Sequence, residues 1–157
     1  MAADTGAASD MSARELEDYL HEHIPLSAAM QATVGALGPD AVVLHAPLAP
    51  NINHRDTVFG GSASALAILA AWSLLHMRLR SEGIAARLVI QRNTMDYALP
   101  ILGEFTASSA LEAPDQWPRF MRTFARMGKA RASVVAVLEA DGLVVGRLTG
   151  EFVALGA

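Results

Sequence analysis

The sequence contains no cysteine among its 157 residues. That absence excludes a disulfide framework, a thiol nucleophile and a thiolate metal site, so the stability of the fold must come from packing. We therefore expect a cytoplasmic protein. No cofactor and no metal are expected either, because the one clustered set of candidate ligands, His21, Glu22 and His23, consists of adjacent residues that point to different faces of a short helix.

Charge is sparse and export signals are missing. The formal net charge is -4. With no dense basic run, the chain lacks the electrostatic footprint of a nucleic-acid-binding protein, and we expect no nucleic-acid partner. A local basic cluster is the exception: Arg119, Arg122, Arg126, Lys129 and Arg131. Residues 1–10 have neither a basic nor an apolar stretch typical of a signal peptide, so we predict a disordered lead-in over 1–11 and a single domain over 12–157.

A long apolar run is also lacking. The best candidate, Ala63 to Leu75, is well short of the roughly 20 apolar residues that cross a bilayer, so we predict a buried helix and no membrane span. The 52% content of hydrophobic residues excludes a mainly disordered chain. The whole composition favours one compact domain.

Local signals predict the elements on either side of this helix. Ser12 and Glu15 form a capping-box pattern for a short helix that ends near His23. The spacing of Trp117, Phe120, Phe124 and Met127 predicts a second short helix that ends at Gly128. Strands are expected on both sides of the turn at 38–40, including 41–48, then over 88–99, 103–111, 131–139 and 143–155, the last two as a hairpin around Asp141-Gly142.

The helix that begins near Gly60 is apolar on every face. Such a helix must be enclosed by other elements, and small alanine side chains allow a sheet to approach it closely. With mostly antiparallel strands around it, we predict an α+β fold in which a curved sheet wraps a long central helix.

A polar loop leads directly into this helix through two glycines. Helix N-termini carry unpaired N–H groups and a partial positive charge, and glycines there let a ligand oxygen approach the backbone. The segment Asn51 to Ser62 is therefore the candidate binding site, suited to an oxyanion or a polarised carbonyl.

Several short motifs carry a family resemblance over roughly residues 15–155. They are Asn51–His54 with Thr57–Ser62, Asp96–Pro100, Gly128–Arg131 and Gly150–Val153. Together with the order of elements, they resemble the hotdog-fold thioesterases, in particular the thioesterase family related to the C-terminal part of YiiD. The resemblance implies a single hotdog domain, an acyl-CoA or acyl-carrier-protein substrate, and a homodimer or higher homo-oligomer.

The resemblance also implies roles in the site. Gly60 and Gly61 would stabilise the oxyanion of a tetrahedral intermediate, although glycines also permit a tight entry into a helix. Asn53 would orient water or the thioester, with an Asx turn as its structural alternative. His54 would be a general base, or simply a hydrogen-bonding residue of the loop. Candidate substrate-binding residues are Asn51, Phe59, Ser62, Ser64 and Tyr97; neither serine lies in a Gly-x-Ser-x-Gly elbow.

One departure from the family is important. Many hotdog thioesterases have an acidic residue on the central helix, about two turns after the glycine, where this chain has Ile68 and Leu69. Asp56 in the loop and Asp96 in a strand are the candidate replacements, unless Asp96 is only a solvent-facing strand residue.

We therefore predict hydrolysis of an acyl thioester whose carbonyl is held at a helix N-terminus, with CoA or phosphopantetheine entering only as part of the substrate. The missing helical carboxylate keeps a non-catalytic acyl-binding module open. A hotdog hydratase or dehydratase would require His54 and Asp96 to lie close together.

Overall fold

The structure is a computed structural model that describes residues 11–156. Its elements are α1 (Ala13–His23), α2 (Pro25–Ala29), β1 (Thr33–Leu37), β2 (Val42–Ala46), a 3-10 turn (Ala49–Asn51), α3 (Gly60–Ser81), β3 (Ala86–Tyr97), β4 (Phe105–Leu111), α4 (Gln116–Met127), β5 (Lys129–Ala140) and β6 (Leu143–Gly156). The strands form one sheet in the order β1-β2-β4-β5-β6-β3, and every neighbouring pair is antiparallel.

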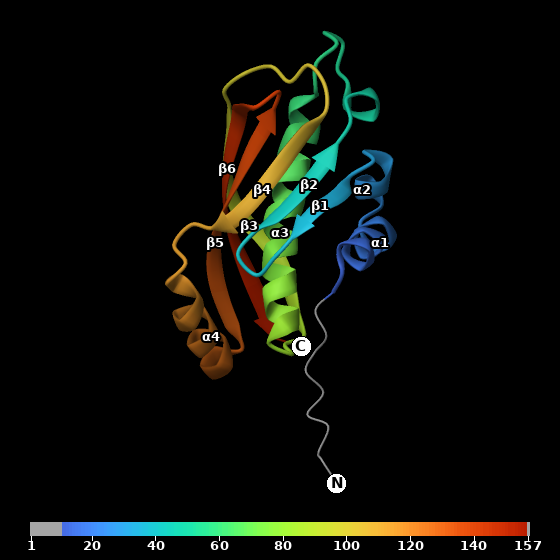
Figure 1. The fold of residues 1–157 in the computed structure, drawn as a ribbon. Helices are drawn as coiled ribbons and strands as arrows, with labels where there is room; N and C mark the ends of the chain where they lie inside the picture. Colours follow the sequence, from blue (N-terminus) through green and yellow to red (C-terminus); the bar gives the residue numbers. More distant parts are fainter. Residues whose placement is uncertain (1–10, 157) are drawn as a thin grey trace.

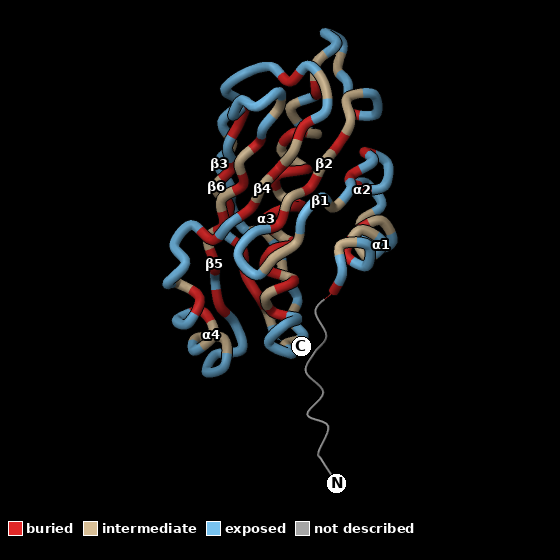
Figure 2. Tube along the Cα trace, viewed as in Figure 1, coloured by how far each residue is buried: buried red, intermediate tan, exposed pale blue. Residues whose placement is uncertain are grey.

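The sheet curves around α3, which runs along its inner face (Figure 1). This arrangement confirms the α+β fold with a long central helix. By length and composition α3 could cross a bilayer, but 61% of its apolar window is buried inside the fold, as expected for a core helix. Figure 2 shows where buried and exposed residues lie: buried positions gather on α3 and the strands, and exposed positions gather in the loops.

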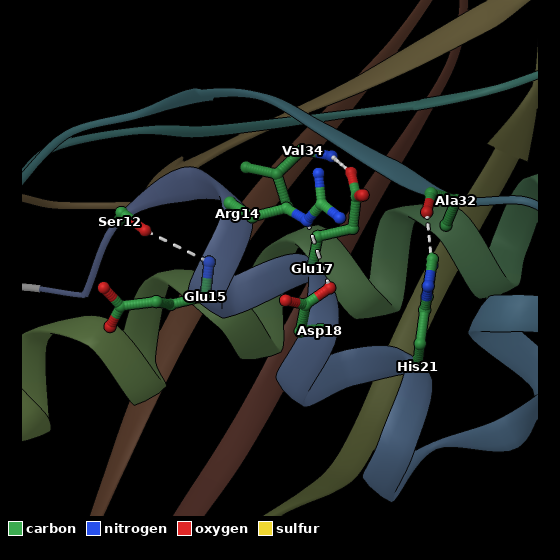
Figure 3. Close-up of polar contacts among 8 residues, drawn as sticks. All are labelled: Ser12, Arg14, Glu15, Glu17, Asp18, His21, Ala32 and Val34. Carbon is green, nitrogen blue, oxygen red and sulfur yellow. Dashed lines mark hydrogen bonds and ion pairs between the residues drawn. The ribbon is translucent and has the colours of Figure 1, made fainter.

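Helix α1 begins as predicted and is tied to the edge strand β1. The Ser12 hydroxyl accepts a hydrogen bond from the Glu15 N–H at 3.1 Å, which caps the helix. The Glu17 carboxylate accepts from the Val34 N–H at 2.9 Å, and His21 Nε2 lies 2.7 Å from the Ala32 carbonyl oxygen (Figure 3). The lead-in was expected over 1–11; residues 1–10 lie outside the described residues, and the expectation is wrong for Met11, which is buried in the core.

A ladder of stacked rings fixes α1 on α3. Tyr19 stacks between His23 and His76, with ring centroids 4.1 and 4.8 Å apart, and His76 stacks on Trp72 at 4.6 Å. The Trp72 indole N–H donates to the Leu88 carbonyl at 3.0 Å, which links the ladder to β3. Burial lowers the pKa of His76 below 6.5, and the neighbouring Arg80 and His23 lower it further.

A missing side chain allows a close contact at the other edge of the sheet. The His45 imidazole lies where a Cβ on Gly35 would be, so any larger residue at position 35 would require the imidazole to move. His45 Nδ1 also lies 3.5 Å from the Glu104 carboxylate at the start of β4. The register of β1 against β2 shifts between Val34 and Ala36, at this glycine.

A bulge in β3 explains why the apolar alternation of this segment is imperfect. The register against β6 shifts between Ile90 and Arg92, which inserts one extra residue. Ile90 lies opposite Phe152 before the shift, and Met95 lies opposite Leu148 after it. Both of these β6 residues are fully buried, so odd-numbered β3 residues after the bulge face α3, and even-numbered ones face outward.

Helix α4 follows the predicted spacing and closes the end of the sheet at which α3 finishes. Its Trp117 and Phe120 are buried and stacked, with centroids 4.7 Å apart. Gly128 ends the helix in a left-handed conformation, with φ of 66°. The predicted hairpin is present as well: Asp141 and Gly142 both have positive φ between β5 and β6.

Candidate functional site

The polar loop before α3 is a small closed turn. Ile52 and Val58 form an isolated β-bridge, and the Asn53 N–H donates to the Thr57 carbonyl at 2.8 Å. The Phe59 N–H donates to the Asn51 carbonyl at 2.7 Å. A further hydrogen bond of 2.9 Å, from the Val58 N–H to the Ile101 carbonyl, ties the loop to the β3–β4 connection. These bonds place the start of α3 in a defined position.

Asn53 uses its side chain to build this loop. Its Oδ1 accepts from the backbone N–H groups of Arg55 and Thr57 at 2.8 and 3.2 Å. Its Nδ2 donates to the Thr57 hydroxyl at 2.9 Å and to the Val58 carbonyl at 3.5 Å. This is the Asx-turn alternative, in which the side-chain amide shapes the backbone. All four hydrogen bonds of the Asn53 amide therefore stay within the loop.

The two glycines begin α3 with free donors. Among the described residues, neither the Gly60 nor the Gly61 N–H donates a hydrogen bond, whereas the next two N–H groups both donate to the Phe59 carbonyl, at 2.9 and 3.1 Å. No side chain caps this helix. Two unpaired donors and the positive end of the helix dipole thus meet at one point.

An aromatic ring covers each glycine. A Cβ on Gly60 would lie 3.4 Å from the Tyr97 ring, and a Cβ on Gly61 would overlap the Phe59 ring. Both rings are largely exposed, Tyr97 at 59% and Phe59 at 57%. The predicted residues Phe59, Gly60, Gly61 and Tyr97 therefore come together at the start of α3.

Two cavities of about 300 Å³ each flank the helix start. One opens beside Gly60 and has an apolar wall formed by α3, the β3–β4 connection and the ends of β5 and β6: Val58, Ala63, Leu99, Ile101, Leu138 and Val145. The other opens beside Gly61 and contains Asn51, Phe59 and Ser62, together with residues of α2. The free N–H groups lie between the two cavities. Ser64 lines neither of them.

Asn51 is the most buried polar residue of the site, with 2% of its surface exposed. Its Nδ2 donates to the carbonyl groups of Met30 and Pro47 at 2.9 and 2.8 Å. Its Oδ1 is buried and has no hydrogen-bond partner among the described residues. A fixed, unsatisfied acceptor is costly unless a ligand or a water occupies the adjoining space.

The acid and base candidates lie on the loop and on the outward side of β3. His54 and Asp56 are exposed at the turn of the loop, and neither side chain makes a hydrogen bond within the described residues. Asp96 lies opposite Arg147 on the outward side of β3, because the bulge turns Tyr97 inward instead. Within one chain, the structure does not bring Asp96 to Gly60.

The central helix α3 carries no carboxylate that could act in place of Asp56 or Asp96. Gly60–Ser81 contains no aspartate or glutamate, and Leu69 is 7% exposed against the core. The departure from the usual hotdog pattern is therefore also a structural fact. Among the described residues, no three His, Asp or Glu side chains gather as a metal site.

The β3–β4 connection was not among the predicted site residues beyond Tyr97, although it adjoins the start of α3. Its Ile101 carbonyl accepts the hydrogen bond from the Val58 N–H, and its side chains form much of the cavity wall beside Gly60. Leu102 and Leu99 are 67% and 47% exposed, unusual for leucines. The signal was present as four apolar residues at the end of the strand expected over 88–99 and directly after it: Ala98, Leu99, Ile101 and Leu102.

A long helix wrapped by a six-stranded antiparallel sheet, with free glycine N–H groups where the helix begins, defines a hotdog fold of the thioesterase type. The fold is similar to that of a protein of unknown function from Chlorobaculum tepidum, with a TM-score of 0.85, 28% identity, and coverage of 92% of this chain and 94% of the other. The model of the family described as "Putative thioesterase (yiiD_Cterm)" matches residues 13–156, and the chain belongs to that family.

Two further crystal structures share the fold at lower identity. A "putative thioesterase" from Shewanella oneidensis has a TM-score of 0.81 at 22% identity, covering 91% of this chain and 96% of its own. A thioesterase from Haemophilus influenzae has a TM-score of 0.73 at 12% identity, covering 95% and 94%. These similarities concern the fold.

Proposed function

We propose that the chain hydrolyses an acyl thioester whose carbonyl oxygen is bound at the start of α3. The observation that carries this proposal is the pair of free N–H groups at Gly60 and Gly61 between two cavities. Donors held in place before the reaction are the main requirement for stabilising an oxyanion. Membership of the thioesterase family supports the same reaction.

In the proposed reaction, a water oxygen attacks the thioester carbon and the carbonyl oxygen becomes an oxyanion. Gly60 and Gly61 donate to that oxygen, and the Tyr97 hydroxyl, next to Gly60, supplies a third donor. The C–S bond then breaks to give a carboxylic acid and a thiol. His54 is the base we propose for the attacking water, because it stands in the loop that leads into Gly60 and its exposed imidazole makes no hydrogen bond among the described residues.

The two cavities receive the two arms of the substrate. We assign the acyl chain to the cavity beside Gly60, because Leu138 and Val145 line it with core hydrocarbon. The pantetheine arm belongs in the cavity beside Gly61, where the unsatisfied Asn51 Oδ1 can accept from an amide N–H. CoA and carrier protein share this arm, so this assignment holds for either.

The active unit is proposed to be a homodimer. β3 is a 12-residue edge strand with mostly exposed residues, and such an edge is usually paired or covered. A second copy along this edge would also cover the exposed Tyr97 at its end. The site would then be completed at the junction of the two chains.

One observation favours an alternative, an acyl-binding module without hydrolysis. α3 offers no carboxylate, and Asp96 faces outward in the single chain. The hydratase alternative has no such support, because it needs His54 and Asp96 together. Binding without turnover would identify the acyl-binding module.

The test is CoA release from a panel of acyl-CoAs, with two variants of one residue. Gly60→Pro deletes one N–H at the first helical position, where proline is favoured, and the preceding Phe59 already has the extended ψ of 133° that precedes proline. Gly60→Ala keeps the N–H and is the matched control. We expect kcat to fall by roughly 10²- to 10³-fold in Gly60→Pro only, as on loss of one oxyanion donor.

The two outcomes are distinct. Equal activity of the Pro and Ala variants would refute the role of this N–H. Absence of turnover in the wild type across the panel, with acyl-CoA binding retained, would refute hydrolysis and leave the acyl-binding module.

A further inference from the structure

Five cations form an exposed stripe on α4 and the start of β5, which we call the basic stripe: Arg119, Arg122, Arg126, Lys129 and Arg131. No acidic residue lies between Gln116 and Leu138. No ion pair within 4.0 Å joins any member of the stripe to a carboxylate of the described residues. The rest of the chain is acidic, with seven Lys or Arg against sixteen Asp or Glu. The stripe is thus an uncompensated positive patch on a negative protein.

The stripe is mounted on a rigid support. The Gln116 side chain exchanges two hydrogen bonds with the backbone of Ser133, at 2.9 and 3.0 Å, as a neighbouring strand would. The Gly156 N–H donates to the Gly128 carbonyl at 2.8 Å, which anchors the other end of the helix to β6. The cations therefore keep a fixed spacing, which favours recognition of a partner with a matching array of charges.

Two open grooves run along the stripe. One lies between α4 and β5 and includes Arg119, Met127, Lys129 and Arg131; the other lies over Arg119, Arg122 and Arg126. Phe120, which lines the first groove, is 3% exposed, so its ring offers no face for stacking a nucleotide base. A long, open row of guanidinium groups fits many separated carboxylates better than one compact nucleotide.

Within one chain, the stripe is far from the glycines. The Arg78 guanidinium lies 4.6 Å from the Trp117 ring, which places α4 at the end of α3, about 27 Å along the helix from Gly60 by the helical rise. Antiparallel pairing of two β3 strands over their full length would change this distance, because it sets Ala86 of one copy beside Tyr97 of the other. Lys129 is two strands from Ala86 in the sheet, so the stripe of one copy would lie about 14 Å, three strand spacings, from the other copy's site.

We propose that the basic stripe docks the acidic surface of an acyl carrier protein, which delivers its thioester to the site of the neighbouring subunit. This inference rests on the proposed thioesterase function and its dimer, and it selects the carrier protein over CoA as the substrate. Each carboxylate of the carrier pairs with a cation of the stripe, and the flexible phosphopantetheine arm spans the remaining distance to Gly60.

The test compares two carriers of the same acyl group. kcat and KM are measured for acyl carrier protein and for acyl-CoA, with the wild type, Arg122→Glu/Arg126→Glu, and the control Arg14→Glu/Arg80→Glu, which reverses two exposed charges elsewhere. We expect the stripe variant to raise KM for acyl carrier protein at least tenfold, with kcat and the acyl-CoA reaction unchanged. The control should change neither reaction.

Three results would overturn the docking proposal: no effect of the stripe variant, an equal effect on both carriers, or an equal effect of the control. A binding titration of phosphopantetheine-bearing carrier protein, followed by fluorescence anisotropy, gives a readout that needs no hydrolysis. Binding that is lost in the stripe variant and weakens from 50 to 200 mM salt supports docking even if hydrolysis fails. Binding of the stripe to anionic lipid vesicles in place of the carrier would also overturn it.

Discussion

The two ends of α3 are built in opposite ways. At its C-terminal end the chain turns back through hydrogen bonds from Glu82, Gly83 and Ile84 to carbonyl groups of the last turn. Arg78 adds a 2.7 Å hydrogen bond to the Pro39 carbonyl and stacks on Trp117. At the N-terminal end, Gly60 and Gly61 keep free N–H groups beneath exposed rings. One end of the helix is closed by hydrogen bonds and packing, and the other keeps two unpaired donors.

A matched pair of aromatic-to-alanine substitutions, one at each end of α3, is the strongest test of this difference between the ends. Trp117→Ala removes a ring that is 7% exposed, and we expect it to lower the free energy of unfolding by about 3–5 kcal/mol. Phe59→Ala removes a ring that is 57% exposed, and we expect a change within about 0.5 kcal/mol. Urea denaturation of both variants measures the difference. Similar losses in the two variants would show that the open end is also structural.

Arg78→Met tests the closed end at a polar group. The variant keeps an unbranched apolar side chain but loses the charged hydrogen bond to Pro39 and the cation–π contact with Trp117. We expect a loss of about 1.5–3 kcal/mol in stability, in line with hydrogen bonds from charged groups. The kcat should be unchanged when it is measured under conditions in which the variant is fully folded. A lower kcat under those conditions would show that the C-terminal end of α3 also affects the reaction.

Tyr97→Phe tests the open end with the removal of one hydroxyl. The phenol lies against Gly60, and loss of a donor to the oxyanion should reduce kcat/KM roughly tenfold, which corresponds to about 1.4 kcal/mol. The melting temperature should stay constant, because the ring is exposed and its packing is kept. A lower melting temperature with unchanged kcat/KM would assign Tyr97 to the scaffold.

The smallest effect concerns His76, in the body of the helix between the two ends. Because burial lowers its pKa in the folded state, the unfolded chain takes up a proton near pH 6.5 that the folded chain does not. The free energy of unfolding should therefore decrease as the pH falls below 6.5, until the pH passes the lowered folded pKa. Urea midpoints between pH 7.5 and 5.5 should show this extra loss in the wild type and not in His76→Gln. Parallel curves would exclude the contribution.

Features set by neighbouring residues could be predicted from the sequence. The Ser12 cap, the Asp141-Gly142 hairpin and the apolar stripe of α4 each depend on residues within a few positions. The glycine pair at the start of α3 is of the same kind, because the absence of Cβ is a property of the residue itself. These local signals predict the order of elements and the start of α3 at the glycine pair.

Features that depend on distant partners could not be predicted. The bulge in β3 is visible only in its pairing with β6, and it decides that Tyr97 faces α3 while Asp96 does not. The cavity wall brings Leu138 and Val145 to Val58 from far along the chain. Asn53 had two roles open in the sequence, and only the positions of four neighbouring polar groups decide between them.

The contact between Gly35 and His45 has a consequence for how this sequence can diverge. A Cβ at residue 35 would occupy the space of the imidazole, so alanine at that position is admissible only after residue 45 has become smaller or turned away. A change at residue 45 made first passes through an intermediate that carries no clash. The order of change therefore matters at these two positions: a smaller residue at position 45 removes the clash in advance, whereas alanine at position 35 first forces the imidazole to move.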